Sequence, residues 1–265
     1  ALIIAVVFVI SELVCVACVP ERPVACDEKP GKISDMFKAL FKNDQAMTVV
    51  VSIILVYTSL NICGNLVLYF FRFDVGNEGA YSIFAAVAFA AQVLVMMVIP
   101  LLRKRFSKSQ LFISGFIIQI AGFAVILIMA FAKLYTPQSW YILCLPGILI
   151  YLGYGMLNVI MTIFLSDSVD YGEVMNGTRE ESVIFSMQTF TVKLASGVAV
   201  FLAGLVVDWI HLDTAAAVQT QDTLDALRMW MTIPSVILLI VGIFVFKRFY
   251  KLDDTRMEEI KSKLN

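Results

Sequence analysis

Long apolar stretches alternate with short polar segments along most of the chain. Each full stretch is close to the roughly 20 residues that an α-helix needs to cross a bilayer. The pattern therefore predicts an all-α fold, a polytopic bundle of transmembrane helices. We expect the end of one span and then six whole spans, at residues 1–19, 47–70, 80–102, 109–132, 138–165, 181–207 and 229–248.

Composition supports a membrane protein and excludes other classes. Hydrophobic residues make up 60% of the chain and charged residues 15%, with a mean hydropathy of +0.87, whereas a soluble domain is about 25% charged. The formal net charge is −1, and the basic residues are spread over several short segments. This pattern offers no basic face for nucleic acid, so the expected surroundings are a lipid bilayer.

The distribution of lysine and arginine predicts how the spans are oriented. Alternate connecting segments, together with the C-terminal tail, contain 16 of these residues on one side. The other side contains three, Arg72, Lys133 and Arg228. Because basic residues are enriched in cytoplasmic loops, we expect the 166–180 segment and the C-terminus in the cytoplasm. The predicted location is a plasma (inner) membrane, crossed several times.

Two polar segments contain short amphipathic patterns. Between 31 and 43, apolar residues recur beside two lysines, which favours a helix lying on the inner membrane surface. The tail from 253 to 264 repeats this pattern, with Met257 and Ile260 in register. We expect a surface helix at each place.

Lys193 belongs to neither side of the membrane. If its helix begins near Thr178, a rise of ~1.5 Å per residue places the lysine roughly 20 Å along the axis. A lysine at that depth costs about 2.5–3.5 kcal/mol, so it should face an aqueous cavity or a carboxylate. Ser182, Ser186 and Thr189 precede it at helical spacing and predict one polar stripe. The alternative is a structural lysine that snorkels or is paired within the bundle.

Two further spans contain polar stripes. One stripe includes Asn158 and Thr162, one turn apart, and the other includes Tyr57, Asn61 and Asn65. Three stripes on three apolar helices predict a common aqueous cavity. For any one stripe, hydrogen bonding between helices is the alternative.

Carboxylates are concentrated in the 166–180 segment and at the start of the next span. We predict that they pair with arginines of another helix bundle, closing the cytoplasmic side in one state and opening it in the other. A solvated turn is the alternative, and Arg179 would pair with one of the acids inside the segment. The acidic residues are Asp167, Asp170, Glu173, Glu180 and Glu181.

The residues offer little for catalysis or metal binding. The chain has one histidine, His211, with Asp208 and Asp213 close by but without a serine motif or a cluster of metal ligands. Cys15 and Cys18 have the spacing of a redox or zinc pair, but they lack a second pair and a nearby histidine. We predict that the protein is not an enzyme and that it has no metal site and no organic cofactor.

The segment from 167 to 193 holds charged and polar residues in a specific order. It begins Asp167-Ser168-Val169-Asp170-Tyr171-Gly172-Glu173 and continues with Arg179, Glu181, Ser182, Ser186, Gln188, Thr189 and Lys193. This order closely resembles the signature of the glycoside/pentoside/hexuronide cation symporters, the melibiose permease-like family of the major facilitator superfamily. The segments 43–45 and 246–252 also look like that family, so the resemblance extends over nearly the whole chain.

The resemblance implies a twelve-helix transporter of which this chain is the C-terminal half. Residues 1–19 would be the end of helix six, 20–46 a cytoplasmic central loop with an interfacial helix, 47–248 helices seven to twelve, and 249–265 a cytoplasmic tail. The N-terminal six-helix half, with the family's cation carboxylates and main sugar-binding acid, would be a missing partner. An apolar start without Met agrees with a cut within a helix.

The resemblance also implies roles for single residues. Lys193 would lie near the cation and sugar sites, and Gln188 and Thr189 would line the sugar cavity. Asn158 stands where melibiose permease has a cavity tryptophan, which favours a substrate other than a galactoside. With Asn61, these are the expected substrate-binding residues. The expected cytoplasmic gate consists of Asp167, Asp170, Glu173, Arg179 and Glu181.

The expected function is secondary active transport, in which a sugar or glycoside moves with a coupling ion, H⁺ or Na⁺, by alternating access. Lys193 would couple to the cation by balancing carboxylates of the other half as they exchange it. Two alternatives stay open: a transporter of a non-sugar solute on the same fold, and a membrane sensor or scaffold that does not transport.

Overall fold

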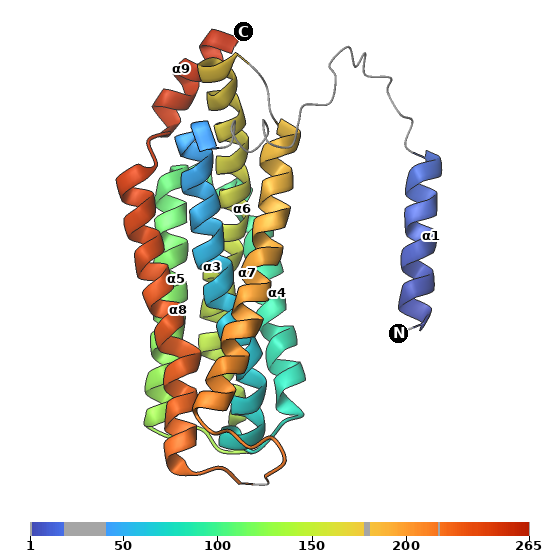
Figure 1. The fold of residues 1–265 in the computed structure, drawn as a ribbon, viewed down its shortest axis with the longest axis vertical. Coiled ribbons are helices and arrows are strands. Elements are labelled where there is room, and N and C mark those ends of the chain that lie inside the picture. Colours follow the sequence, from blue (N-terminus) through green and yellow to red (C-terminus); the bar gives the residue numbers. More distant parts are fainter. Residues whose placement is uncertain (1, 19–40, 178–180, 217, 265) are drawn as a thin grey trace. The chain divides into compact units, whose positions relative to one another are not determined.

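The computed structural model describes residues 2–18, 41–177, 181–216 and 218–264, and the chain separates into two compact units, Ala1–Asp35 and Met36–Asn265. The first unit contains one described helix, the apolar α1 (Leu2–Cys18). The second contains a bundle of long helices (Figure 1). Most of the expected surface helix between 31 and 43 lies outside the described residues.

Six helical segments of the second unit are long and apolar enough to cross a membrane. The described part of the chain contains no strand, so the all-α fold and the six predicted spans are confirmed. The elements are α3 (Asp44–Tyr69), the π-helix η1 (Phe70–Val75), α4 (Ala80–Leu102), α5 (Lys108–Phe131), the 3₁₀-helix η2 (Trp140–Leu143), α6 (Cys144–Asn176), α7 (Glu181–Trp209), α8 (Gln221–Phe249) and α9 (Asp254–Leu264).

The helix α6 is longer than hydropathy predicts. The apolar stretch ends at 165, but α6 continues through the acidic residues to Asn176, so most of the expected 166–180 connection is helical. Hydropathy measures only the part of a helix that suits hydrocarbon, whereas backbone hydrogen bonding continues through polar residues. The helix ends at Gly177, whose φ of 73° is the left-handed conformation that favours glycine.

Polar caps also move two helix starts outward from their predicted positions. α3 begins at Asp44 because the buried Asn43 side chain accepts a hydrogen bond from the Ala46 backbone N–H at 2.9 Å. α8 begins at Gln221, where the Thr220 hydroxyl accepts one from the Thr223 N–H at 3.2 Å. Arg228 therefore lies two turns inside a helix rather than in a connection.

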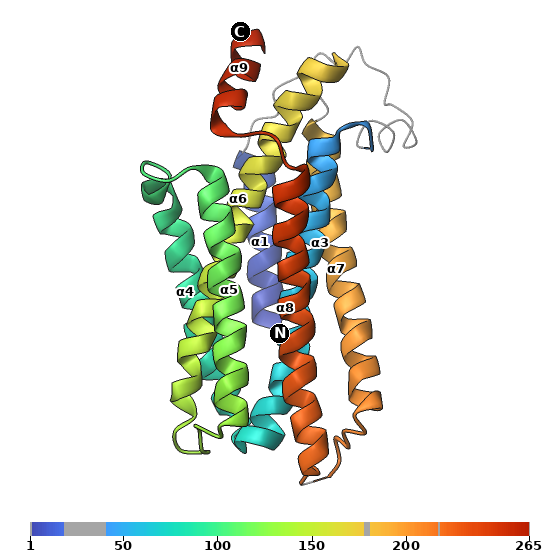
Figure 2. The same cartoon turned by 90° about the vertical axis from the view of Figure 1, so that its left-hand side faces the viewer.

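α3 and α6 are the central helices of the bundle. α6 packs against α4 and α5, α3 packs against α7 and α8, and the two also contact each other (Figure 2). At the α5–α6 crossing the backbones are so close that a Cβ at Gly153 would lie 2.5 Å from the Gly115 carbonyl oxygen. Small residues permit this approach, which supplies van der Waals contact where lipid removes most of the hydrophobic driving force.

The C-terminal helix α9 lies against the polar end of α6. Leu252, Met257 and Ile260 are buried and pack with Tyr171 and Val174 of α6. The amphipathic stripe expected to lie on the membrane thus contacts protein, and α9 extends the bundle at this end (Figure 2).

Candidate functional site

The polar stripe of α7 lies on a face that the bundle leaves open. Lys193 is exposed, as are Ser186 and Thr189, whereas the nearby Thr191 and Ala195 are buried. Lys193 has no hydrogen bond or ion pair with any residue that the structure describes. The described part of the chain therefore offers no partner for the alternative interpretation, in which Lys193 is paired within its own bundle.

Hydrogen bonds connect the α7 stripe to the α6 stripe. The Gln188 side-chain amide donates to the Thr162 hydroxyl at 3.3 Å. Thr162 in turn donates to the Asn158 carbonyl oxygen one turn earlier, at 3.2 Å. Thr189 bonds only within its own helix, to the Phe185 carbonyl oxygen at 3.4 Å.

The α6 stripe also meets the α3 stripe. The Asn158 amide donates to the Tyr57 hydroxyl at 2.5 Å, and the Tyr57 ring lies edge-on to Tyr154 with 5.4 Å between the ring centroids. Asn61 donates to the Tyr57 carbonyl oxygen at 2.7 Å, which leaves its side-chain oxygen available. The structure thus brings Gln188, Asn158 and Tyr57 into one chain of contacts across three helices.

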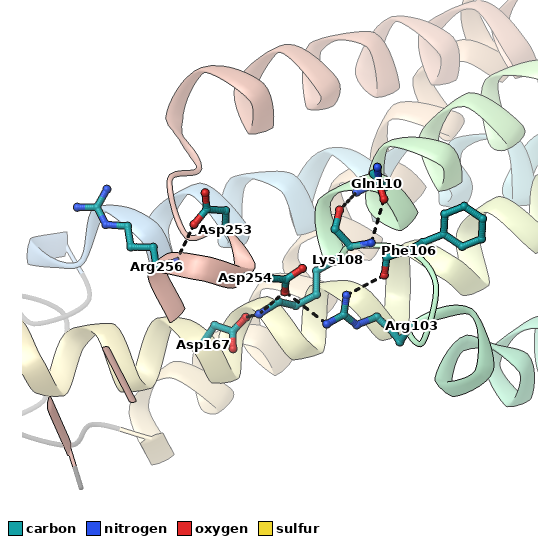
Figure 3. A network of polar contacts seen from close by, with 9 residues as sticks. Arg103, Phe106, Lys108, Gln110, Asp167, Asp253, Asp254 and Arg256 are labelled. Carbon is teal, nitrogen blue, oxygen red and sulfur yellow. Dashed lines mark hydrogen bonds and ion pairs between the residues drawn. The ribbon is translucent and has the colours of Figure 1, made fainter. Parts of the chain in front are cut away.

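A network of charges lies at the end of the bundle next to α9. Lys108, at the start of α5, forms an ion pair with Asp167 of α6, and both side chains are more than nine-tenths buried. Asp254 of α9 lies 3.4 Å from the Lys108 ammonium and 3.4 Å from the Arg103 guanidinium (Figure 3). This inner network joins α5, α6 and α9 together with the turn after α4.

The partner of Asp167 differs from the sequence-based expectation. We expected arginines of another bundle, but Asp167 is buried against a lysine of the same unit. Both residues fall on the predicted cytoplasmic side, yet only the packing of α5 on α6 brings them together. Burial raises the pKa of the neighbouring Tyr250 phenol, with smaller contributions from the negative charges of Asp167 and Asp254.

The other expected gate residues lie beyond this network. Asp170 and Glu173 are half-buried on the polar extension of α6, and Glu181 is exposed at the first residue of α7. All three interact with other parts of the protein. Arg179, like Glu180, lies outside the described residues, so its part in a gate stays a prediction.

Sequence reasoning missed two polar residues that support this end of α6. In the sequence Lys108 counts only as one basic residue of a connecting segment, and Asn43 only as part of the segment 43–45 that resembles the family. The Asn43 amide, besides capping α3, donates to the Ser168 carbonyl oxygen at 2.8 Å. A Cβ at Gly172 would lie 2.8 Å from the same amide nitrogen, so the glycine leaves room for Asn43.

A second network of charges lies at the opposite end of the bundle and was also missed. Arg228 of α8 binds Asp74 of η1 through two nitrogens, at 2.6 and 2.8 Å, and Asp225 at 2.7 Å. The Tyr135 hydroxyl donates to the Asp74 carboxylate at 2.6 Å. Burial and the Asp74 carboxylate raise the pKa of Tyr135 above its usual range. This outer network joins α8 to η1 and to the connection after α5.

The described residues contain no group of three or more His, Cys, Asp or Glu side chains placed to hold a metal ion. The polar surface over α3, α6 and α7 instead consists of amides, hydroxyls and one ammonium. Such groups donate and accept hydrogen bonds without forming a nucleophile–base pair. The arrangement suits binding of a polar solute.

Comparison with known proteins identifies the family. Residues 1–254 match the model of the family described as MFS/sugar transport protein. Similar relatives include an uncharacterized symporter, YjmB, of Bacillus subtilis (strain 168), which is 25% identical over 88% of this chain and 49% of its own length. The raffinose carrier protein of Pediococcus pentosaceus is 23% identical over 88% of this chain and 35% of its own.

The isoprimeverose transporter of Lactiplantibacillus pentosus is 25% identical over 96% of this chain and 51% of its own length. The chain thus spans about half the length, or less, of these curated relatives. The family match covers both compact units and six helices that could cross a membrane. The chain belongs to the MFS/sugar transport protein family.

Proposed function

We propose that this chain is the C-terminal part of a secondary active transporter that moves a sugar or glycoside together with H⁺ or Na⁺. A second six-helix bundle would complete the cavity, and alternating access would expose it to each side in turn. The observation that carries this proposal is Lys193, an exposed lysine on the open polar face of a helix long enough to cross the membrane. The names of the sugar-transporting relatives support the substrate class.

The amide and hydroxyl groups around Lys193 would bind sugar hydroxyls. Gln188 and Asn158 are already oriented by contacts with Thr162 and Tyr57, and each keeps an unused carbonyl oxygen. Thr189 and Asn61 would add hydrogen bonds from α7 and α3. Groups fixed before binding lose less entropy when the substrate arrives.

Lys193 would link the sugar to the coupling ion. An ammonium facing the other bundle would pair with carboxylates there when no cation occupies them and release them when a cation binds. The gate would consist of Asp167, Asp170 and Glu173 on the part of α6 beyond residue 165, Glu181 at the start of α7, and Arg179. In this proposal the inner network holds the polar end of α6 in place while Asp170, Glu173 and Glu181 exchange their contacts for pairs across the two bundles in one state.

The test is uptake of labelled glycosides into vesicles that contain the full-length protein. A proton gradient, a sodium gradient or no gradient is imposed, and Lys193→Ala is compared with Lys104→Ala, which removes an exposed lysine outside the spans. Symport predicts gradient-dependent accumulation that Lys193→Ala abolishes and Lys104→Ala retains. Equilibration without accumulation would contradict coupling, and uptake by Lys193→Ala at the normal rate would contradict the role of the lysine.

A further inference from the structure

A hollow lies between α3 and α7 at the end of the bundle opposite α9. Its volume is about 530 Å³. Asn65 and Tyr69 of α3 line one side, and Phe201, Gly204 and Asp208 of α7 line the other. None of the proposed sugar-binding residues borders it, so the hollow is a separate place on the molecule.

The hollow continues the face of α7 that contains Lys193. The residues that follow Lys193 on this face are Gly197, Gly204 and Asp208, at successive intervals of four, seven and four residues. An α-helix brings residues at these intervals onto one side. Asp208 is therefore ~22 Å along the helix from Lys193. A Cβ at either glycine would meet no atom within 4 Å, so the space beside the helix is open at both positions.

The groups in the hollow suit a neutral polyhydroxylated ligand. The Asp208 side chain is exposed and has no hydrogen bond or ion pair within the described residues, so both carboxylate oxygens can accept hydroxyl hydrogen bonds. One N–H of the Asn65 side-chain amide donates to the Asn61 carbonyl oxygen at 2.7 Å, and the second N–H and the amide oxygen remain available. Tyr69 adds a phenol.

Phe201 supplies the apolar part of the hollow. Its side chain is 66% exposed, and the electron-rich face of an aromatic ring attracts the polarised C–H bonds of a sugar. A few convergent polar groups beside an aromatic ring are typical of small-molecule sites. The hollow contains a carboxylate and no basic residue, which disfavours an anionic ligand.

We propose that this hollow is an entry subsite, which binds one neutral sugar unit before the sugar reaches the residues around Lys193. The inference rests on the proposed function for its substrate class. Asp208 is the principal hydrogen-bond acceptor of the subsite, and Phe201 is its stacking surface.

One experiment measures binding without requiring transport. Gly204→Cys is made in the full-length protein and labelled in vesicles with a membrane-impermeant maleimide, with isoprimeverose, sucrose or no sugar present and the parent protein as the background. We expect either glycoside to slow labelling and Asp208→Asn to remove that protection. Equal labelling with and without both glycosides would overturn the subsite, and so would absence of labelling, because other atoms would then fill the hollow.

A second experiment measures the contribution of the subsite to uptake. Loss of a hydrogen bond to a charged group predicts that Asp208→Asn raises the KM for uptake roughly tenfold without changing the maximal rate. Asp222→Asn, an exposed acid in the first turn of α8, should leave KM unchanged. Failure of symport would appear as uptake without accumulation in the parent protein, whereas failure of the subsite would appear as an unchanged KM in Asp208→Asn.

Discussion

The two ends of the bundle hold their buried charges in different ways. In the outer network the side chains of Arg228 and Asp74 are 3% and 4% exposed, and two nitrogens of one bind both oxygens of the other. In the inner network the side chains of Lys108 and Asp167 are 8% and 6% exposed but share a single contact, and the third member, Asp254, makes two contacts of 3.4 Å. At the outer end, two short hydrogen bonds join one arginine to one aspartate. At the inner end, each pair of charged groups shares only one contact.

This difference indicates which end can rearrange. Bidentate contacts fix both distance and orientation, so the outer network makes α8, η1 and the connection after α5 one rigid piece. The inner network depends on α9 and on the extension of α6, which carries several of the proposed gate residues. We infer that the outer end of this unit is held more firmly than its inner end.

Removal of Arg228 should have the largest effect. Arg228→Met leaves Asp74 buried without its two strongest hydrogen bonds, and breaking such a pair costs about 3–5 kcal/mol. Thermal unfolding of the full-length protein in detergent measures the loss. The matched control is the double variant with Asp74→Leu, which removes both charges and should recover most of the stability. No recovery in the double variant would mean that the pair itself is worth more than its desolvation.

Removal of Lys108 should cost less, by the same measurement. Lys108→Met deprives Asp167 of one strong hydrogen bond rather than two, so we expect a loss at the low end of the about 3–5 kcal/mol that breaking a buried ion pair costs. Asp254 loses only one of its two contacts. A loss equal to that of Arg228→Met would contradict the distinction between the two ends.

Tyr135→Phe tests the outer network through pH. Because the pKa of Tyr135 is raised in the folded protein, its contribution is complete below the ordinary tyrosine pKa of about 10 and is lost as pH rises above it. We expect the variant to lose about 1–2 kcal/mol near neutral pH and the difference from the parent to shrink above pH ~10. A difference that stays constant across this range would show that the hydroxyl does not titrate against Asp74.

Asp254→Asn should have the smallest effect on stability and the most local one. A partly exposed ion pair contributes about 0–1 kcal/mol, so the unfolding temperature should hardly change. Amide hydrogen exchange within α9 should nevertheless increase, because the helix loses its link to Lys108 and Arg103. Asp253→Asn, which removes one charge but keeps a side-chain oxygen that accepts from the Arg256 backbone N–H and leaves that link intact, is the comparison. Equal exchange in the two variants would contradict the link.

The sequence predicts the bundle well because hydrophobic length reports directly on membrane crossing. Each of the six spans corresponds to a helix of the structure. The errors lie where polar residues extend a helix beyond hydrocarbon. α6 passes 165 and ends at Asn176, next to its cap Gly177, and α8 begins at Gln221 rather than near 229. Capping side chains and glycines determine where these two helices begin or end, and a hydropathy profile does not detect such residues.

The candidate site is predictable in its residue types but not in its pairings. Helical spacing identifies the stripes through Lys193, Asn158 and Tyr57, because each stripe lies on one helix. The ion pair between Lys108 and Asp167 joins residues 59 positions apart, and only the rotation and depth of two packed helices bring them together. The pairing of Asp74 with Arg228 is invisible in sequence for the same reason, and the π-helix adds a rotation that regular periodicity does not contain.

The length of α6 has a mechanical consequence. Its 33 residues measure ~50 Å at 1.5 Å per residue, against roughly 30 Å for the hydrocarbon core of a bilayer. The part of α6 beyond the hydrocarbon core is a rigid helical arm, and α9 packs against it. Rocking of the bundle by about 10° about its middle would swing the tip of the arm by roughly 4 Å, more than the length of a hydrogen bond. A rigid rotation too small to disturb the packing of α3 against α6 could thus make or break contacts at the acidic tip.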